Sequence, residues 1–166
     1  MVTIIRAAIF PTFVVLIFIF WVRLDAAMGW HGPRVRWLAA PLLLAGTALV
    51  AWCIGLFRVL GHGTPLPFVA KTQRLVVSGP YKYVRNPMMW GVGAIVTGTA
   101  LWFGSVGLWF GFAMFIAFVM IFVPAYEERD MERRFGEEYR EYCRQVPRWW
   151  PRFRPKTDAG TKARAA

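Results

Sequence analysis

Residues 37–57 read WLAAPLLLAGTALVAWCIGLF, an uncharged run bounded by Arg36 and Arg58. A helix rises about 1.5 Å per residue, so a run of this length crosses the roughly 30 Å hydrocarbon core of a bilayer. The run therefore predicts a transmembrane helix, and the apolar runs on either side of it are interpreted in that light.

Three further runs fit an all-α integral membrane protein. Residues 4–22 predict a first span; a cleaved signal peptide competes, but the run is long for one and residues 24–27, LDAA, make a poor cleavage site. Residues 88–103 predict a short span of about 24 Å, which needs a thin bilayer or longer neighbours. Residues 106–126 predict a fourth span. Only Gly104-Ser105 separates it from the third span, so these two spans are expected to form a tight antiparallel hairpin.

The composition excludes several classes of protein. The 166 residues are 57% hydrophobic with a mean hydropathy of +0.43, which excludes a disordered chain, a secreted disulfide scaffold and an ordinary soluble globule. Cys53 and Cys143 lie too far apart to indicate a zinc site or a disulfide framework, and Cys53 is interpreted as a core residue. Gly107 and Gly111 form GxxxG, which favours helix packing within one subunit over a dimer interface. The oligomeric state stays open.

The net charge of +11 is unevenly placed along the chain. With four crossings, 17 Lys and Arg fall on the side that holds the N-terminus, residues 58–87 and the C-terminal region, and 3 fall on the other. This excess places both termini and the polar segments in the cytoplasm. Anionic lipid headgroups account for such cations, so no nucleic acid partner is expected.

The sequence divides into three parts. Residues 1–60 hold the first two spans, 61–154 a polar segment, the hairpin and C-terminal helices, and 155–166 a tail expected to be disordered. Residues 127–144 predict an amphipathic helix that Gly136 divides, with an apolar face at Met131, Phe135, Tyr139 and Tyr142.

Residues 61–87 are too polar for the membrane and too rich in glycine and proline for one helix. Gly61-His62-Gly63 is on its own typical of a turn where a chain leaves a membrane. Asn86-Pro87 suits the N-cap and first turn of the third span.

The acidic residues are unusually placed. None lies between Asp25 and the pair Glu127-Glu128, which follows the fourth span on the side that holds Arg85. Pro124, just before the pair, can kink the helix. Taken alone, the pair favours a solvated helix end whose carboxylates meet the nearby cations Arg129, Arg133 or Arg134. A polar cleft containing the pair is the other interpretation.

The combined pattern resembles a known superfamily. Residues 79–88, GPYKYVRNPM, followed by Gly91, and then Glu127-Glu128, RFGEEY at 134–139 and VPRW at 146–149, are similar to motifs of the isoprenylcysteine carboxyl methyltransferase and phospholipid methyltransferase superfamily. The resemblance covers roughly residues 61–151. Asn86 replaces the superfamily's frequent His, and Met89 stands where Tyr is usual.

The resemblance implies an integral membrane methyltransferase that uses S-adenosyl-L-methionine, releases S-adenosylhomocysteine and lacks a Rossmann domain; no metal site is expected from the sequence. It implies that the adenosine part is lined by Leu75, Val76, Gly79, Pro80 and Tyr81. The polar groups of the cofactor would be held near Arg85, Asn86, Pro87, Glu127 and Glu128. Adjacent helical residues point about 100° apart, so we expect only one of the two glutamates to face the cofactor.

Two catalytic roles follow for two kinds of acceptor. Arg85 would hold an acceptor carboxylate, as in isoprenylcysteine-type O-methylation, which needs no base. Glu128 would accept a proton from an amine, as in phospholipid-type N-methylation. The acceptor, a lipophilic small molecule or a lipidated molecule, is expected to enter from the bilayer beside the short third span. The competing hypotheses are a non-enzymatic membrane protein that binds anionic lipid or a partner, and, last, an NADPH-dependent membrane reductase.

Overall fold

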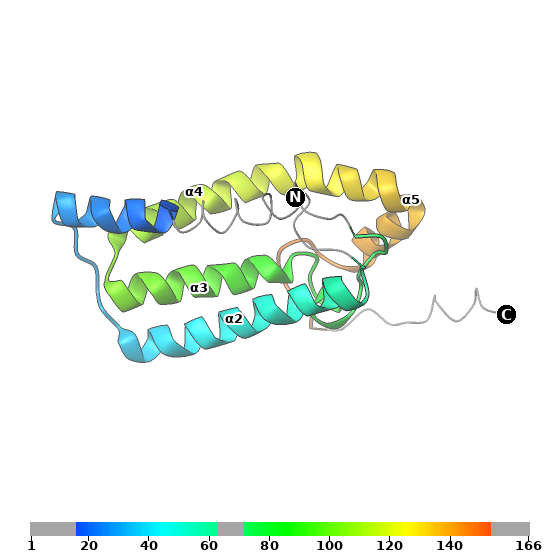
Figure 1. Cartoon of the computed structure of the whole chain (residues 1–166). Coiled ribbons are helices and arrows are strands. Elements are labelled where there is room, and N and C mark those ends of the chain that lie inside the picture. Colours follow the sequence, from blue (N-terminus) through cyan, green and yellow to red (C-terminus); the bar gives the residue numbers. More distant parts are fainter. Residues whose placement is uncertain (1–15, 63–71, 154–166) are drawn as a thin grey trace, which may run out of the picture.

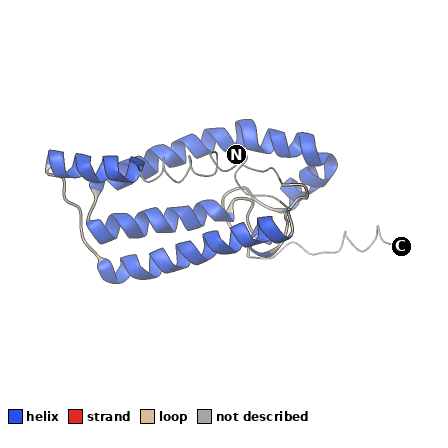
Figure 2. Cartoon of the chain, viewed as in Figure 1, coloured by secondary structure: helices blue, strands red, loops and turns tan. Residues whose placement is uncertain are grey.

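The structure is a computed structural model that describes residues 16–62 and 72–153, and those residues form helices and loops without a strand (Figure 2). This confirms the all-α prediction for the described part of the chain. After a helix whose described part covers residues 16–28, the elements are, in order, α2 (Arg36–Val59), η1 (Gly79–Lys82), α3 (Pro87–Phe103), α4 (Val106–Phe122), η2 (Val123–Glu127) and α5 (Glu128–Gln145).

Glycines bring α2 and α3 into close contact, and the two helices lie side by side (Figure 1). A Cβ atom at Gly46 would lie 2.7 Å from the carbonyl oxygen of Gly91, and one at Gly98 would lie 3.0 Å from that of Ala39. Small residues are the usual device for helix contact in a membrane, because lipid tails compete for apolar side chains. The α2–α3 pair is thus the tightly packed unit of the fold.

The predicted hairpin turn is confirmed. Gly104 ends α3 in the left-handed conformation at φ 68°, and Ser105 caps α4 by accepting a hydrogen bond from Leu108 N. The buried Asp25 side chain accepts hydrogen bonds from Ser105 Oγ and Gly107 N. The helix that contains Asp25 is thereby attached to the start of α4.

The two glycines of GxxxG contact that helix. A Cβ at Gly107 would lie 3.0 Å from the carbonyl oxygen of Trp21, and one at Gly111 would collide with the Trp21 ring nitrogen. The interpretation as packing within one subunit is therefore confirmed.

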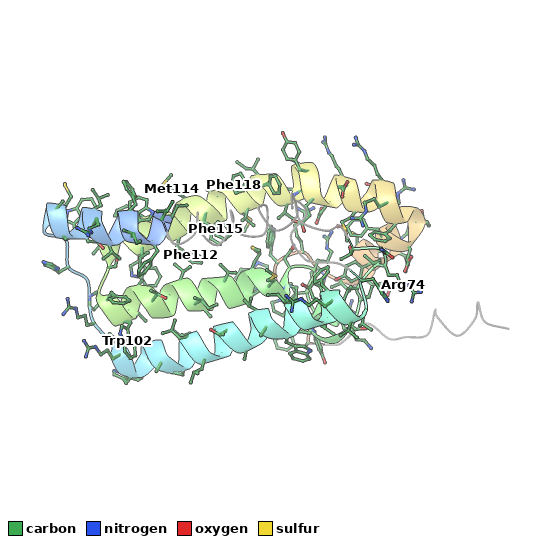
Figure 3. All side chains as sticks on the ribbon, viewed as in Figure 1. Arg74, Trp102, Phe112, Met114, Phe115 and Phe118 are labelled. Carbon is green, nitrogen blue, oxygen red and sulfur yellow. The ribbon has the colours of Figure 1, made fainter. Side chains whose placement is uncertain are left out.

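Two helices of the described part could cross a membrane by length and composition. Of the described helices, α2 and the continuous helical run Val106–Gln145 are long and apolar enough to cross a membrane, and α3 is a shorter apolar helix of 17 residues. Residues 4–15 of the first predicted span and the tail at 155–166 lie outside the described residues, so four crossings stay a prediction. The outer side of α4 carries exposed apolar groups, among them Met114 and Phe118 (Figure 3).

The helix that begins with α4 changes geometry at Pro124. Residues Val123–Glu127 form a π-helical turn, and α5 follows with its first residue at Glu128. Proline lacks an N–H group and disrupts the regular hydrogen-bond ladder, which accounts for the turn. Gly136, at φ 54° and ψ −126°, divides α5 as expected. The second half of α5 consequently folds back toward η1 and the start of α3 (Figure 1).

Candidate functional site

Residues 75–77, which precede the Gly-Pro-Tyr motif, form an extended segment between two apolar clusters. Val76 packs with Cys53 and Tyr81, while Leu75 and Val77 pack against the cluster of Tyr139, Tyr142 and Val146. Side chains alternate along an extended chain, so Leu75 and Val76 face opposite sides and share no surface. Cys53 is fully buried, which confirms its interpretation as a core residue.

The Gly-Pro-Tyr motif forms η1 against α2. Gly79 adopts φ +58°, and a Cβ there would lie 3.0 Å from Leu56 Cδ1, so both the conformation and the space favour glycine. Pro80 is the second residue of this 3-10 turn. The Tyr81 ring is buried in edge contact with Phe57 at 5.3 Å, and burial raises the pKa of its hydroxyl. Tyr81 is therefore a neutral packing residue.

Three charged side chains from three segments meet beyond η1. Arg85 Nη1 donates to Glu128 Oε1 at 2.8 Å, and Arg148 donates from Nε to Oε1 at 2.8 Å and from Nη2 to Oε2 at 2.6 Å. The side chains of Arg85 and Glu128 are 13% and 15% exposed, whereas Arg148 is 36% exposed. We call these three residues the charge cluster. Two arginines against one carboxylate leave the cluster with a net positive charge.

This pairing corrects one interpretation of the sequence. The helix-end carboxylate of Glu128 was expected to meet Arg129, Arg133 or Arg134, but its partners are Arg85 and Arg148. Arg134 instead pairs with Asp130 and donates to the carbonyl oxygen of Thr72. Arg85 and Glu128 are thus in direct contact, although they are 43 residues apart in the sequence.

The Nε–H group of Arg85 is a buried donor without a partner among the described residues. Arg85 Nη1, by contrast, donates to Cys143 Sγ at 2.9 Å as well as to Glu128. A buried donor without an acceptor is costly, and in native proteins it usually signals a water or ligand atom nearby. The charge cluster thus has a donor available for a polar ligand.

Glu127 occupies a different environment from its neighbour. It ends η2 just past the apolar part of α4, and burial, followed by the carboxylates of Glu128 and Asp130, raises its pKa above the ordinary value. The two adjacent glutamates consequently differ: Glu128 is paired with arginines, whereas burial and neighbouring carboxylates raise the pKa of Glu127.

The segment after α5, residues 146–152, crosses over the start of α3, and we call it the C-terminal strap. Four hydrogen bonds to backbone carbonyl oxygens attach it: Arg85 N to Pro147, Asn86 Nδ2 to Arg148, Trp90 Nε1 to Trp149, and Arg152 N to Tyr83. The strap therefore keeps its position without using the side chain of Arg148.

Asn86 and Pro87 fill the positions expected of them with one difference. Asn86 is the N-cap residue of α3 and Pro87 its buried first residue, but the Asn86 side chain makes no cap hydrogen bond. Its amide donates to the strap at 3.2 Å instead. Sequence reasoning quoted Arg148 only as part of a motif and missed its role in the cluster.

A different feature lies at the opposite end of the bundle. An apolar hollow of about 200 Å³ is lined there by Leu43, Thr99, Trp102 and Phe103. Figure 3 shows Trp102 at that end and Arg74 at the end that holds α5. None of the lining residues is titratable, so the charge cluster is the better candidate for a reactive site.

Comparison with known proteins agrees with this arrangement. An uncharacterized protein of Haemophilus influenzae is 40% identical over 55 residues, which are 33% of this chain and 87% of that protein. No solved structure matches the chain significantly. The model of the phospholipid methyltransferase family matches residues 35–138, which include Arg85 and Glu128. This match covers more than half of the chain, and the chain therefore belongs to the phospholipid methyltransferase family, a family of membrane methyltransferases.

Proposed function

We propose that the protein is a multi-pass membrane methyltransferase that transfers a methyl group from S-adenosyl-L-methionine to a lipid-like or lipidated acceptor. The observation that carries the proposal is the charge cluster, in which Arg85 and Glu128 converge within the family-matched region. An exposed ion pair would be weak evidence for a functional site. This pair is largely buried, and Arg85 Nε is a donor without an acceptor among the described residues.

The chemistry of the cluster fits the cofactor. Its amino-acid part carries a carboxylate and an ammonium, which require a guanidinium and a carboxylate respectively. Arg85, Arg148 and Glu128 supply both. Burial of the unpartnered Arg85 Nε indicates that an acceptor atom belongs beside it. When bound, the cofactor supplies an electrophilic methyl group on a sulfonium sulfur.

The protein's own contribution is positioning and exclusion of water. Displacement at a methyl group requires the nucleophile, carbon and leaving sulfur in line, so fixed binding groups supply much of the rate enhancement. Arg85 is held by Glu128, by Cys143 and by its backbone bond to Pro147, so its guanidinium is well fixed. The strap and the buried tyrosines of α5 limit the access of water from the cytoplasmic side.

Two types of acceptor fit this proposal. A carboxylate acceptor, as in isoprenylcysteine-type O-methylation, complements the net positive charge and needs no base. An amine acceptor, as in phospholipid-type N-methylation, must lose a proton, and Glu128 supplies the carboxylate of the cluster for that step. Entry from the bilayer beside the short α3 suits either.

Binding of S-adenosylhomocysteine to the detergent-purified protein tests the proposal. We expect calorimetric binding and thermal stabilisation of the wild type, and weaker binding by at least tenfold in Arg85→Ala and Glu128→Ala. Arg144→Ala is the matched control, because Arg144 forms exposed ion pairs with Glu137 and Glu141 on the outer side of α5. A folded wild type that shows no binding at saturating ligand would instead favour a non-enzymatic lipid-binding protein.

A further inference from the structure

The side chain of Arg148 is bound to Glu128, but it does not help to attach the C-terminal strap to the rest of the protein. The strap is attached by backbone carbonyl oxygens, including the one of Arg148 itself. At 36% exposed, the Arg148 side chain is much more accessible than that of Arg85 at 13%, and its guanidinium takes no part in the hydrogen bonds that attach the strap.

The contact between Arg148 and Glu128 shows what this guanidinium recognises. Two N–H groups meet two carboxylate oxygens at 2.8 and 2.6 Å, which is the paired geometry that makes arginine selective for carboxylates. A ligand carboxylate offers the same two acceptors. Exchange of one carboxylate for another would therefore leave the donors of Arg148 satisfied.

Exchange also releases Glu128 to take a cation. Glu128 has both oxygens occupied, one by Arg85 and Arg148 together and the other by Arg148 alone. When Arg148 turns to a ligand, Oε2 becomes free to accept from an ammonium group, while Arg85 still holds Oε1. The pair of Arg148 and Glu128 is thus complementary to a group that carries a carboxylate and an ammonium together.

We propose that Arg148 is a cofactor-binding residue: it leaves Glu128 to bind the carboxylate of the cofactor's amino-acid part, and Glu128 then binds the ammonium of the same part. This proposal rests on the proposed function, and it identifies the part of the cofactor that the charge cluster binds. Arg85 is excluded from this exchange because it is more buried and is also bonded to Cys143. The phosphate and ammonium of a lipid headgroup share this zwitterionic chemistry, so the test includes them.

The test measures dissociation constants for S-adenosylhomocysteine and for its decarboxylated analogue, which keeps the adenosine, sulfur and amine. We expect the wild type to bind the first roughly ten- to a hundredfold more tightly, and Arg148→Gln to lose this preference while its affinity for the analogue changes less than threefold. Arg148→Lys, which keeps the charge without the fork, should retain part of the preference. Arg144→Gln, with the same change of charge, should retain all of it.

The opposing outcomes are distinct. Equal weakening of both ligands in a folded Arg148→Gln protein would assign Arg148 a structural role and overturn the proposal, as would no weakening of either. Competition by glycerophosphoethanolamine that depends on Arg148, with unchanged binding of S-adenosylhomocysteine, would assign the pair to a lipid headgroup instead. If Arg148→Gln does not fold, Arg148→Lys decides by its preference alone. Absence of all binding in the wild type would overturn the proposed function as well.

Discussion

Glu128 is the residue on which the charge cluster depends. It is the shared acceptor of Arg85 and Arg148, so its carboxylate keeps two positive charges together in a partly enclosed space. Its neighbour Glu127 lacks this role and is held in a setting that disfavours ionisation. Two adjacent residues of the same type thus lie in different electrostatic settings, and each can be tested.

Glu128→Ala should reduce both ligand binding and stability. Removing one partner from a buried ion pair leaves the other uncompensated, which typically costs about 3 kcal/mol, and here Arg85 is the cation left behind. Thermal or denaturant unfolding in detergent measures the loss. Glu137→Ala is the control, because Glu137 forms only exposed ion pairs on α5, and we expect no measurable change. Equal stability of the two variants would contradict the assignment of Glu128 as the centre of the cluster.

Glu127→Gln should stabilise the protein in a pH-dependent way. The folded-state pKa of Glu127 is raised, so the ionised carboxyl destabilises the folded state once the pH exceeds the unfolded-state value, and that cost is complete above the folded-state value. Below the unfolded-state value the cost vanishes. The melting temperature of Glu127→Gln should exceed that of the wild type at pH 8, and the difference should disappear as the pH falls below the unfolded-state pKa. The exposed Glu138→Gln is the control, and a pH-independent difference would contradict this account.

At the scale of elements, the sequence predicted the helices better than the site. Residues 37–57 and 88–103 became the cores of α2 and α3, because apolar runs of this length have no other way to satisfy their backbone groups in a membrane. Gly104-Ser105 forms a turn and Gly136 breaks a helix. Both effects depend on the residues themselves and their immediate neighbours, so they can be predicted from the sequence. Arg148 could not be anticipated in this way: its partner lies 20 residues earlier, and their contact depends on how α5 folds back at Gly136.

The α2–α3 contact can be tested with a matched pair of glycines on α2. Gly46→Ala should destabilise the protein by about 1–3 kcal/mol, because the new methyl group would lie 2.7 Å from the carbonyl oxygen of Gly91. Gly55→Ala meets nothing within 4 Å and should be neutral or stabilising by up to about 1 kcal/mol, since alanine is the better helix former. Unfolding in detergent measures both. The same response in both variants would contradict the close approach of α2 and α3.

For the whole molecule, the arrangement separates two chemically different ends. The charge cluster, η1 and α5 lie at one end, and the hollow beside Trp102 lies at the other. At that other end Arg36 lies 5.8 Å from the Trp102 ring centroid and Arg34 Nε donates to the carbonyl oxygen of Phe103 at 3.1 Å. Arg34 and Arg36 thus contact the C-terminal end of α3, as expected of residues at a membrane–water interface.

The uneven distribution of Lys and Arg predicts the orientation of the molecule in the membrane. An inverted topology would carry 17 of the 20 Lys and Arg residues across the membrane, whereas the expected one carries 3. In a bacterial host, green fluorescent protein fused after residue 166 should therefore fluoresce, and alkaline phosphatase there should be inactive. Alkaline phosphatase fused after His31, in the loop that follows helix 16–28, should be active. Phosphatase activity at residue 166 would put the charge cluster on the side opposite to the cytoplasmic pool of S-adenosyl-L-methionine, and both the topology and the proposed reaction would have to be abandoned together.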